Sequence, residues 1–277
     1  MASFPCGRSV FEGMDRASAG QRVKSIAAPF LGTHLGPASP TSQHLAFIRK
    51  AKDLGKPSQS IRFHPKAVGA VQKTVLRKLG PAMTQRQFYL AGGTALATYF
   101  GHRHSVDFDW FTGKQIEDPL RLAQEIRDKR ISFKASSIER GTLYGTVSGI
   151  RVSLLEYRYP LLRPLAPWPG FGCLMASLED IACMKLSAVA QRGSKKDFVD
   201  IYALGLKHIP LKEMLQLYQK KYAIKDIAHV LYGLTYFDDA EQERMPKMFW
   251  NIDWKTIKKT IQGWIRDAVR SQTPKPI

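Results

Sequence analysis

The sequence predicts an α+β protein in which a small mixed β-sheet core with flanking helices is followed by a helical domain. Short strand-like runs and amphipathic helical stretches alternate between residues 61 and 165. A Pro-rich stretch at 159–172 follows. Beyond it, residues 170–272 show helical apolar spacing and helix-start signals throughout. We therefore expect an α/β core at 61–165 and a helical domain at 170–272.

The first 60 residues are rich in Ser, Ala, Gly and Pro and show no sustained helical or strand period. We expect residues 1–60 to form a disordered or poorly ordered leader. Several arginines and few acids are also a feature of organelle transit peptides, but no clear amphipathic helix accompanies them. A misassigned upstream start codon is an equal alternative.

The elements of the predicted α/β core follow one another at short intervals. Apolar residues recur at helical spacing from Val68 to Leu79, and we expect Gly80-Pro81 to end this helix. The elements expected next are a buried strand at 87–91, a turn at Gly92-Gly93, a helix at 94–100, a strand at 106–111, a helix at 119–129, and strands within 133–139, 143–149 and 151–157.

Two S-x-x-D sequences mark helix starts in the predicted helical domain. Ser177 with Asp180 and Ser194 with Asp197 both match a capping box, so each serine should precede a helix. Later amphipathic segments are expected at 211–222, 225–234 and 253–269.

Composition and charge narrow the class of function. The chain has 42 Lys and Arg against 23 Asp and Glu, a formal charge of +19 that should attract polyanions such as nucleic acids or nucleotides. The alternative is that the excess of lysine only keeps the protein soluble. The sequence has no apolar run long enough for a membrane span and no secretory signal, and its three cysteines lack a CxxC spacing. We expect a cytoplasmic protein with no membrane partner.

Asp107 and Asp109 are the first candidate site residues. On a strand they would point to the same face, while Phe108 points to the other. Two adjacent carboxylates cost free energy unless a cation lies between them, and oxygen ligands with a phosphate partner suit Mg²⁺. Such a metal would bridge nucleotide oxygens during phosphoryl transfer. The alternative is an exposed strand that happens to carry two aspartates.

A Gly92-Gly93-Thr94 sequence precedes these carboxylates at a predicted helix start. Exposed N–H groups and the helix dipole favour a phosphate there, so these three residues are candidate nucleotide ligands. Arg103 is expected to meet phosphate as well. Ser105 is a further nucleotide-binding candidate, although a hydrogen bond within the turn would equally explain it.

The sequence resembles a known family in these motifs. The stretches "GGTAL" at 92–96 and "GHRHSVDFDWF" at 101–111 resemble the signature of nucleotidyltransferase-fold proteins, and specifically of the AbiEii-type toxin family. Residues 177–204 and 234–241 are also similar to that family, so the resemblance spans roughly 87–264. It implies a nucleotidyltransferase-like core for the predicted sheet.

The resemblance also implies roles for individual residues. Asp197 would be catalytic, and the equal alternative is that its carboxylate only caps a helix. Lys185 would also be catalytic, and its alternative is an ordinary exposed lysine. A third carboxylate is common on a later strand of such folds, and here Ser153 stands in its place with Glu156 nearby. The implied sites are catalytic residues Asp107, Asp109, Lys185 and Asp197, metal ligands Asp107 and Asp109, and nucleotide contacts at Gly92, Gly93 and Thr94.

By this resemblance the chain is a Mg²⁺-dependent nucleotidyltransferase and a toxin with a separately encoded antitoxin. It would transfer a nucleoside monophosphate from a nucleoside triphosphate (NTP) to an RNA hydroxyl, since some family members modify transfer RNA. The first alternative is a catalytically weak nucleotide- or RNA-binding protein of the same fold. A D-x-D glycosyltransferase would explain the carboxylates but not the Gly-Gly-Thr turn.

Overall fold

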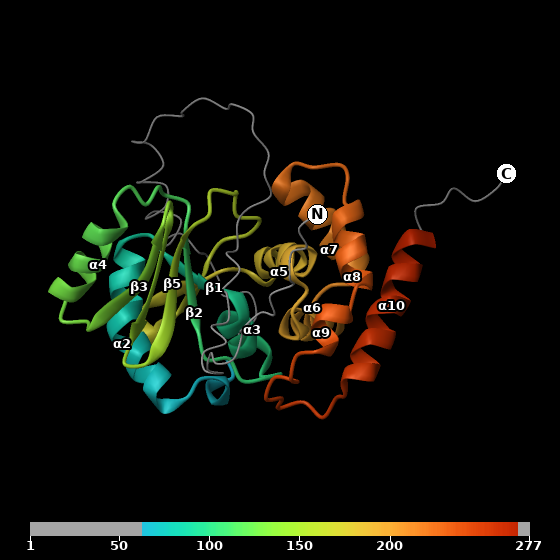
Figure 1. Cartoon of the computed structure of the whole chain (residues 1–277), viewed down its shortest axis with the longest axis horizontal. Helices are drawn as coiled ribbons and strands as arrows, with labels where there is room; N and C mark the ends of the chain where they lie inside the picture. Colours follow the sequence, from blue (N-terminus) through green and yellow to red (C-terminus); the bar gives the residue numbers. More distant parts are fainter. Residues whose placement is uncertain (1–62, 271–277) are drawn as a thin grey trace, which may run out of the picture.

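The computed structural model of the chain describes residues 63–270, so the leader predicted at 1–60 lies outside the described residues. A twisted sheet with flanking helices lies beside a group of helices that ends in α10 (Figure 1). The predicted α+β fold class, a mixed sheet followed by helices, is confirmed.

The sheet of the described region has seven strands in the order β3-β4-β5-β2-β1-β7-β6. Strand β2 runs antiparallel to β1 and parallel to β5, and β1 runs parallel to β7. The centre of the sheet is therefore formed by β5, β2 and β1. The strands are β1 (Tyr89–Ala91), β2 (Phe108–Thr112), β3 (Phe133–Glu139), β4 (Thr142–Val147), β5 (Ile150–Glu156), β6 (Ala166–Trp168) and β7 (Cys173–Met175).

The helices after residue 177 begin and end close to the predicted segments.

None of the helices between residues 63 and 270 is long and apolar enough to cross a lipid bilayer. The helices are η1 (Pro65–Ala67), α2 (Ala70–Gln85), α3 (Gly92–Phe100), α4 (Pro119–Asp128), η2 (Pro169–Phe171), α5 (Leu178–Arg192), α6 (Lys195–Lys207), α7 (Leu211–Tyr222), α8 (Ala228–Thr235), α9 (Asp238–Glu241) and α10 (Trp254–Arg270).

Helix α2 continues through Gly80 and Pro81 to Gln85, so the predicted helix end at this dipeptide was wrong. A Cβ on Gly80 would lie 2.3 Å from the carbonyl oxygen of Phe171, which shows how closely α2 packs on η2. Beyond the proline, the buried side chain of Met83 continues the apolar face. This glycine therefore permits close packing, and the burial of the following turn outweighs the hydrogen bond lost at the proline.

The Pro-rich stretch at 159–172 contributes to the sheet, which the sequence did not predict. Its residues 166–168 form β6, and β7 follows at once and pairs with β1 through Leu90 and Met175. Each of these strands has three residues, too few for an alternating pattern to be recognised.

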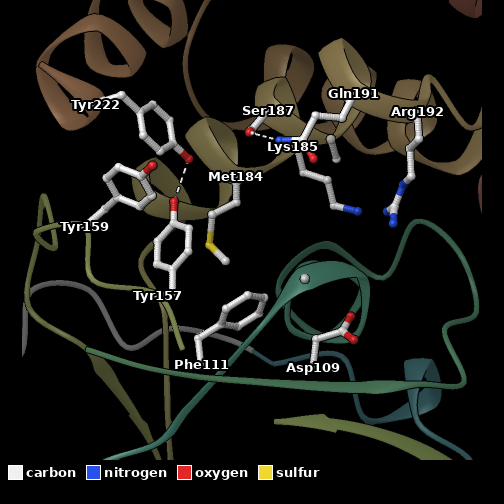
Figure 2. A pocket seen from close by; sticks show the side chains of 12 residues that line it. Asp109, Phe111, Tyr157, Tyr159, Met184, Lys185, Ser187, Gln191, Arg192 and Tyr222 are labelled. Carbon is white, nitrogen blue, oxygen red and sulfur yellow. Dashed lines mark hydrogen bonds between the residues drawn. The ribbon is translucent and has the colours of Figure 1, made fainter. Parts of the chain in front are cut away.

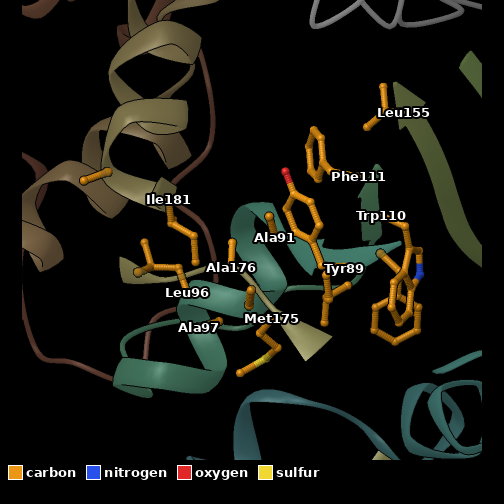
Figure 3. Close-up of a cluster of buried hydrophobic side chains, with 14 of the residues drawn as sticks. Tyr89, Ala91, Leu96, Ala97, Trp110, Phe111, Leu155, Met175, Ala176 and Ile181 are labelled. Carbon is orange, nitrogen blue, oxygen red and sulfur yellow. The ribbon is translucent and has the colours of Figure 1, made fainter. Parts of the chain in front are cut away.

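Helix α3 lies between the sheet and the helical half and contacts β1, β2, α5 and α6. Leu96 on α3 packs near Met175, Ala176 and Ile181 in one continuous apolar core (Figure 3). The Tyr99 hydroxyl donates a hydrogen bond of 3.0 Å to the Ala176 carbonyl. Helix α3 is thus held at a fixed position between the central strands and α5.

Substitution of Gly233 tests the contact between α8 and α5. A Cβ at this position would lie 2.8 Å from the Ala190 Cα, a backbone atom that cannot move alone. We expect Gly233→Ala to lower the free energy of unfolding by about 1–3 kcal/mol in urea denaturation, because the helices must separate. The control is Gly263→Ala in α10, where the nearest atom is the flexible Arg266 end at 3.9 Å and helix propensity favours alanine. Equal stability of Gly233→Ala and the parent would contradict this packing.

Candidate active site

The first turn of α3 carries the Gly92-Gly93 pair, which the sequence predicted as a turn before the helix. Gly92 has a φ of +65°, in the left-handed region that favours glycine. A Cβ here would lie 2.6 Å from Asp109 Oδ2, and a Cβ on Gly93 would lie 2.5 Å from Arg103 Nη2. The two glycines therefore allow a carboxylate and a guanidinium to pack against the start of α3.

Asp109 lies in β2 at the centre of the sheet, between Ala91 of β1 and Ser153 of β5. Burial and the charge of Asp107 raise the pKa of its carboxyl group, and a hydrogen bond from Ser153 lowers that pKa only in part. Among residues 63–270, no cation is in ion-pair contact with this carboxylate. A cation placed beside Asp109 would therefore stabilise its charge.

Asp107 lies one residue before β2 and is held from two sides. The Arg151 guanidinium donates two hydrogen bonds of 2.8 Å to the two carboxylate oxygens. The Thr94 hydroxyl donates to the backbone carbonyl of Asp107 and hydrogen-bonds the Ser105 hydroxyl at 2.9 Å. Thr94 is 1% exposed. The structure thus places Thr94 and Ser105 beneath the carboxylate pair, where they fix the backbone that leads into β2.

Asp200 of α6 is the centre of a buried ion network that the sequence analysis missed. Its carboxylate accepts hydrogen bonds of 2.7 and 2.8 Å from Arg103 and contacts Lys185 Nζ at 2.6 Å. His102 Nε2 lies 2.8 Å from the same carboxylate. Burial alone would raise the pKa of Asp200, but the charges of Arg103 and Lys185 hold it well below its usual value. Arg103 is therefore committed to a buried carboxylate that joins the segment before β2 to α6.

Asp197 lies one turn earlier on α6 and belongs to the same network. It contacts Lys185 Nζ at 2.9 Å and accepts two hydrogen bonds from Arg192, at 2.7 and 3.0 Å. Burial alone would raise the pKa of its carboxyl group, but the charges of Lys185 and Arg192 hold that pKa below its usual value. Because Lys185 is buried between two carboxylates, it stays charged, and its pKa is raised despite the burial.

The predicted capping box at Ser194 is not formed, although α6 does begin at the next residue. Ser194 makes no side-chain cap hydrogen bond, since the Asp197 N–H donates to the Ser194 carbonyl at 2.8 Å, and the Asp197 carboxylate turns inward to its two cations. The other predicted cap is formed in part: the Ser177 hydroxyl accepts a hydrogen bond of 3.0 Å from the Asp180 N–H. The alternative reading of Asp197 as a helix cap is therefore wrong.

A cleft lies between this part of the sheet and α5, and its two ends differ in chemistry (Figure 2). At one end the side chains of Lys185 and Arg192 point from α5 toward Asp109. The other end is lined by Met184 and aromatic rings. Including its open mouth, the cleft has an empty volume of about 530 Å³. The aromatic lining consists of Phe111, Tyr157, Tyr159 and Tyr222.

Lys196 adds an exposed cation near the charged end of the cleft. Its charge interacts with those of Arg192 and Asp107. Among the described residues, it has no hydrogen-bond or ion-pair partner. The Lys196 ammonium group is therefore available to an anion that enters the cleft.

Glu156 lies away from the carboxylate pair. On β5, Ser153 is the residue that pairs with Asp109, whereas Glu156 is paired with Thr112 at the far end of β2. The Glu156 carboxylate accepts a hydrogen bond of 3.0 Å from the Ile116 N–H and pairs with a neighbouring arginine. Ser153 therefore occupies the position next to Asp109 where a third carboxylate could have stood.

The chemistry of Asp107 and Asp109 fits a divalent cation. They supply two carboxylates close to the Ser153 hydroxyl, and no cation in the described chain is in ion-pair contact with Asp109. Within residues 63–270, no group of three or more His, Cys, Asp or Glu side chains could hold a metal ion. A bound Mg²⁺ would thus need oxygen ligands from a phosphate and from water, as is usual for this ion.

Of the predicted site residues, Gly92, Asp109 and Lys185 line the cleft itself. The others lie around or behind it, as described above. Several residues around the cleft were not predicted from the sequence, namely Asp200, Arg192, Lys196, Arg151 and the aromatic lining. Only Asp200 had a usable signal, since it lies three residues after Asp197 and therefore on the same helix face.

Comparison with known proteins gives a family for most of the chain. The family model described as nucleotidyl transferase AbiEii toxin, type IV TA system, matches residues 75–270. An uncharacterized protein of Aquifex aeolicus, aq_aa25, is 42% identical over 200 residues, which cover 71% of this chain and 97% of that protein.

Solved structures with a similar arrangement are more distant. JHP933 from Helicobacter pylori is 15% identical, with a TM-score of 0.46 over 75% of this chain and 95% of its own. MenT4, a nucleotidyltransferase toxin from Mycobacterium tuberculosis, is 13% identical, with a TM-score of 0.49 over 74% of this chain and 82% of its own.

Substitution of Asp200 tests the buried ion network. Asp200→Asn leaves buried Arg103 and Lys185 without this carboxylate, so we expect a loss of about 3–5 kcal/mol of unfolding free energy at pH 7. The pKa of Asp200 is lower in the folded than in the unfolded chain, so its ionised carboxylate stabilises the folded protein above about pH 4. This stabilisation is lost progressively as the pH falls below about 4 toward the folded-state pKa. The difference between parent and variant should therefore shrink between pH 4 and pH 3 in urea denaturation.

The matched control is Asp128→Asn, which alters an exposed carboxylate on the surface of the protein. It should change stability by no more than about 0.5 kcal/mol. A loss below about 1 kcal/mol for Asp200→Asn at pH 7 would show that the network does not hold the two halves together.

Proposed function

Because the chain belongs to the AbiEii nucleotidyl transferase toxin family of type IV toxin–antitoxin systems, we propose that it transfers a nucleoside monophosphate from an NTP to RNA with Mg²⁺. Membership of this family makes the chain a nucleotidyltransferase, with an antitoxin as its partner. The proposal adds the metal, the orientation of the nucleotide and the RNA acceptor.

One observation carries the proposal, namely that a single cleft joins a cationic end to an aromatic end. A nucleotide has the same division, with anionic phosphates at one end and a flat base at the other. We place the phosphates near Lys185 and Arg192 and the base among the aromatic rings. Base–aromatic stacking contributes about 1–3 kcal/mol per base in other sites.

Asp107 and Asp109 are the proposed Mg²⁺ ligands, together with oxygens of the bound nucleotide. Mg²⁺ held there would neutralise charge on the phosphates. The buried carboxylate of Asp109, which no cation contacts in the described chain, supports this assignment. Gly92 would keep the start of α3 clear of both the carboxylate and the phosphates.

Lys185 and Arg192 would balance the negative charge of the phosphates, and the exposed Lys196 would add to them. Asp197 holds the first two of these cations by direct ion pairs. We therefore assign Asp197 a positioning role, since its carboxylate is fully occupied. Arg103 and Asp200 have the same kind of role behind it.

The base end of the cleft offers groups that could distinguish one nucleotide from another. The Tyr157 and Tyr222 hydroxyls are hydrogen-bonded to each other, and Gln191 donates to the Ser187 hydroxyl at 3.0 Å. The amide oxygen of Gln191 and the Tyr159 hydroxyl remain as possible partners for the edge of a base. We propose that these groups select the NTP.

The proposed acceptor is an RNA hydroxyl, whose oxygen forms the new bond to the α-phosphorus while pyrophosphate leaves. The net charge of +19 supports a polyanionic acceptor, since a strongly basic protein attracts nucleic acid over long distances. Incubation of the protein with Mg²⁺, total RNA and each of the common NTPs labelled at the α-phosphate tests this directly. Labelled RNA is the expected product with at least one NTP.

Asp109→Asn should reduce this transfer at least about a hundredfold, because the metal loses a ligand at the reacting phosphate. In EDTA the variant should melt at or above the parental temperature, since a buried carboxylate with a raised pKa costs stability once it ionises. The control is Glu156→Gln, which alters a carboxylate of the same sheet that lies away from Asp109 and should keep parental transfer. Parental transfer by Asp109→Asn would remove the metal from the proposed mechanism.

A further inference from the structure

Arg151 lies on β5 outside the cleft lining and contacts Asp107, the residue that precedes β2. Its guanidinium meets the Asp107 carboxylate in a two-pronged arrangement, with Nε to Oδ1 and Nη2 to Oδ2 both at 2.8 Å. Both carboxylate oxygens are therefore engaged by one cation. The Arg151 side chain is 59% exposed, so it can leave this position without disturbing the core.

The same carboxylate is one of the two proposed metal ligands. Arg151 and a metal ion would compete for the oxygens of Asp107, because both are cations that need the same lone pairs. The arginine also relieves the repulsion between Asp107 and Asp109 while no other cation is bound. A metal that binds alone must displace Arg151 and leave the guanidinium without an anion.

A nucleotide changes this balance because it brings its own anions. The planar guanidinium fork that fits a carboxylate also fits a phosphate. We propose that Arg151 is an exchangeable counter-ion that holds Asp107 before ligands bind and moves to the triphosphate when metal and nucleotide bind together. This inference rests on the proposed function and names a further residue that orients the substrate.

The exchange makes metal and nucleotide binding cooperative. Each ligand removes a cost for the other: the metal frees Arg151 from Asp107, and the triphosphate supplies a new partner for the freed guanidinium. Such coupling is reciprocal, so the metal strengthens nucleotide binding by the same factor by which the nucleotide strengthens metal binding. In the absence of Arg151 the two ligands should bind more independently.

The test measures the two ligands separately in Arg151→Gln. Mn²⁺ serves as the metal probe, followed by electron paramagnetic resonance, and an NTP with a non-cleavable α,β-methylene bond serves as the nucleotide. Mn²⁺ alone should bind about three- to tenfold more tightly than to the parent, because its competitor at Asp107 is gone. The NTP analogue should bind the Mn²⁺-loaded variant about tenfold or more weakly, because an arginine–phosphate contact is lost.

These opposite changes separate ligand exchange from a merely structural role, which would weaken both ligands together. Arg151→Lys keeps the charge without the fork, so it should bind Mn²⁺ nearly as the parent does and the nucleotide with intermediate affinity. Arg121→Gln is the matched control. It breaks an exposed arginine–carboxylate pair on α4, between Arg121 and Glu125, and should change neither affinity.

Unchanged affinities in Arg151→Gln, or weaker binding of both ligands, would overturn the inference. Measurement of Mn²⁺ binding to a separate Asp109→Asn variant distinguishes failure of this inference from failure of the proposed function. If Mn²⁺ binding depends on Asp109 but is equal in the parent and Arg151→Gln, only the role of Arg151 is wrong. If Mn²⁺ binds neither the parent nor Arg151→Gln even with the NTP analogue present, the metal site itself is absent and both proposals fail.

Discussion

The active site depends on one buried ion network, in which Asp197 and Asp200 of α6 hold Lys185, Arg192 and Arg103. Buried charges are costly unless they are paired, so these five side chains must keep their mutual geometry. Arg103 comes from the segment before β2, whereas the other cations come from α5. The network therefore fixes the carboxylates of the sheet opposite the cations of the helical half.

The network also sets the electrostatics of the cleft. Its three cations exceed its two carboxylates by one positive charge, and two of the cations, Lys185 and Arg192, point toward Asp109. The start of α3 packs against both kinds of charge, because Gly92 leaves room for the Asp109 carboxylate and Gly93 leaves room for the Arg103 guanidinium. Cationic side chains of α5 and the carboxylates of Asp107 and Asp109 thus lie close together, which suits a metal-bound polyphosphate better than either ion alone.

The sequence was informative where a local pattern has a physical meaning. The Gly-Gly pair and the alternating carboxylates indicated α3 and β2, although α3 already begins at Gly92 and Asp107 precedes β2. Helix capping signals gave the starts of α5 and α6. The roles of Arg151 and Arg192 could not be predicted, because their partners lie on other elements of the fold. Asp197 shows the same limit, since tertiary ion pairs override its local capping role.

The central claim is that the cleft holds an NTP with its phosphates beside the carboxylate pair and its base among the aromatic rings. A crystal structure with Mn²⁺ and a non-cleavable NTP analogue tests it most directly, since Mn²⁺ is located by anomalous scattering. The account predicts Mn²⁺ bound by Asp107 and Asp109, phosphates next to Lys185 and Arg192, and the base between Phe111 and the tyrosines. A nucleotide bound outside the cleft, or Mn²⁺ away from both aspartates, would contradict it.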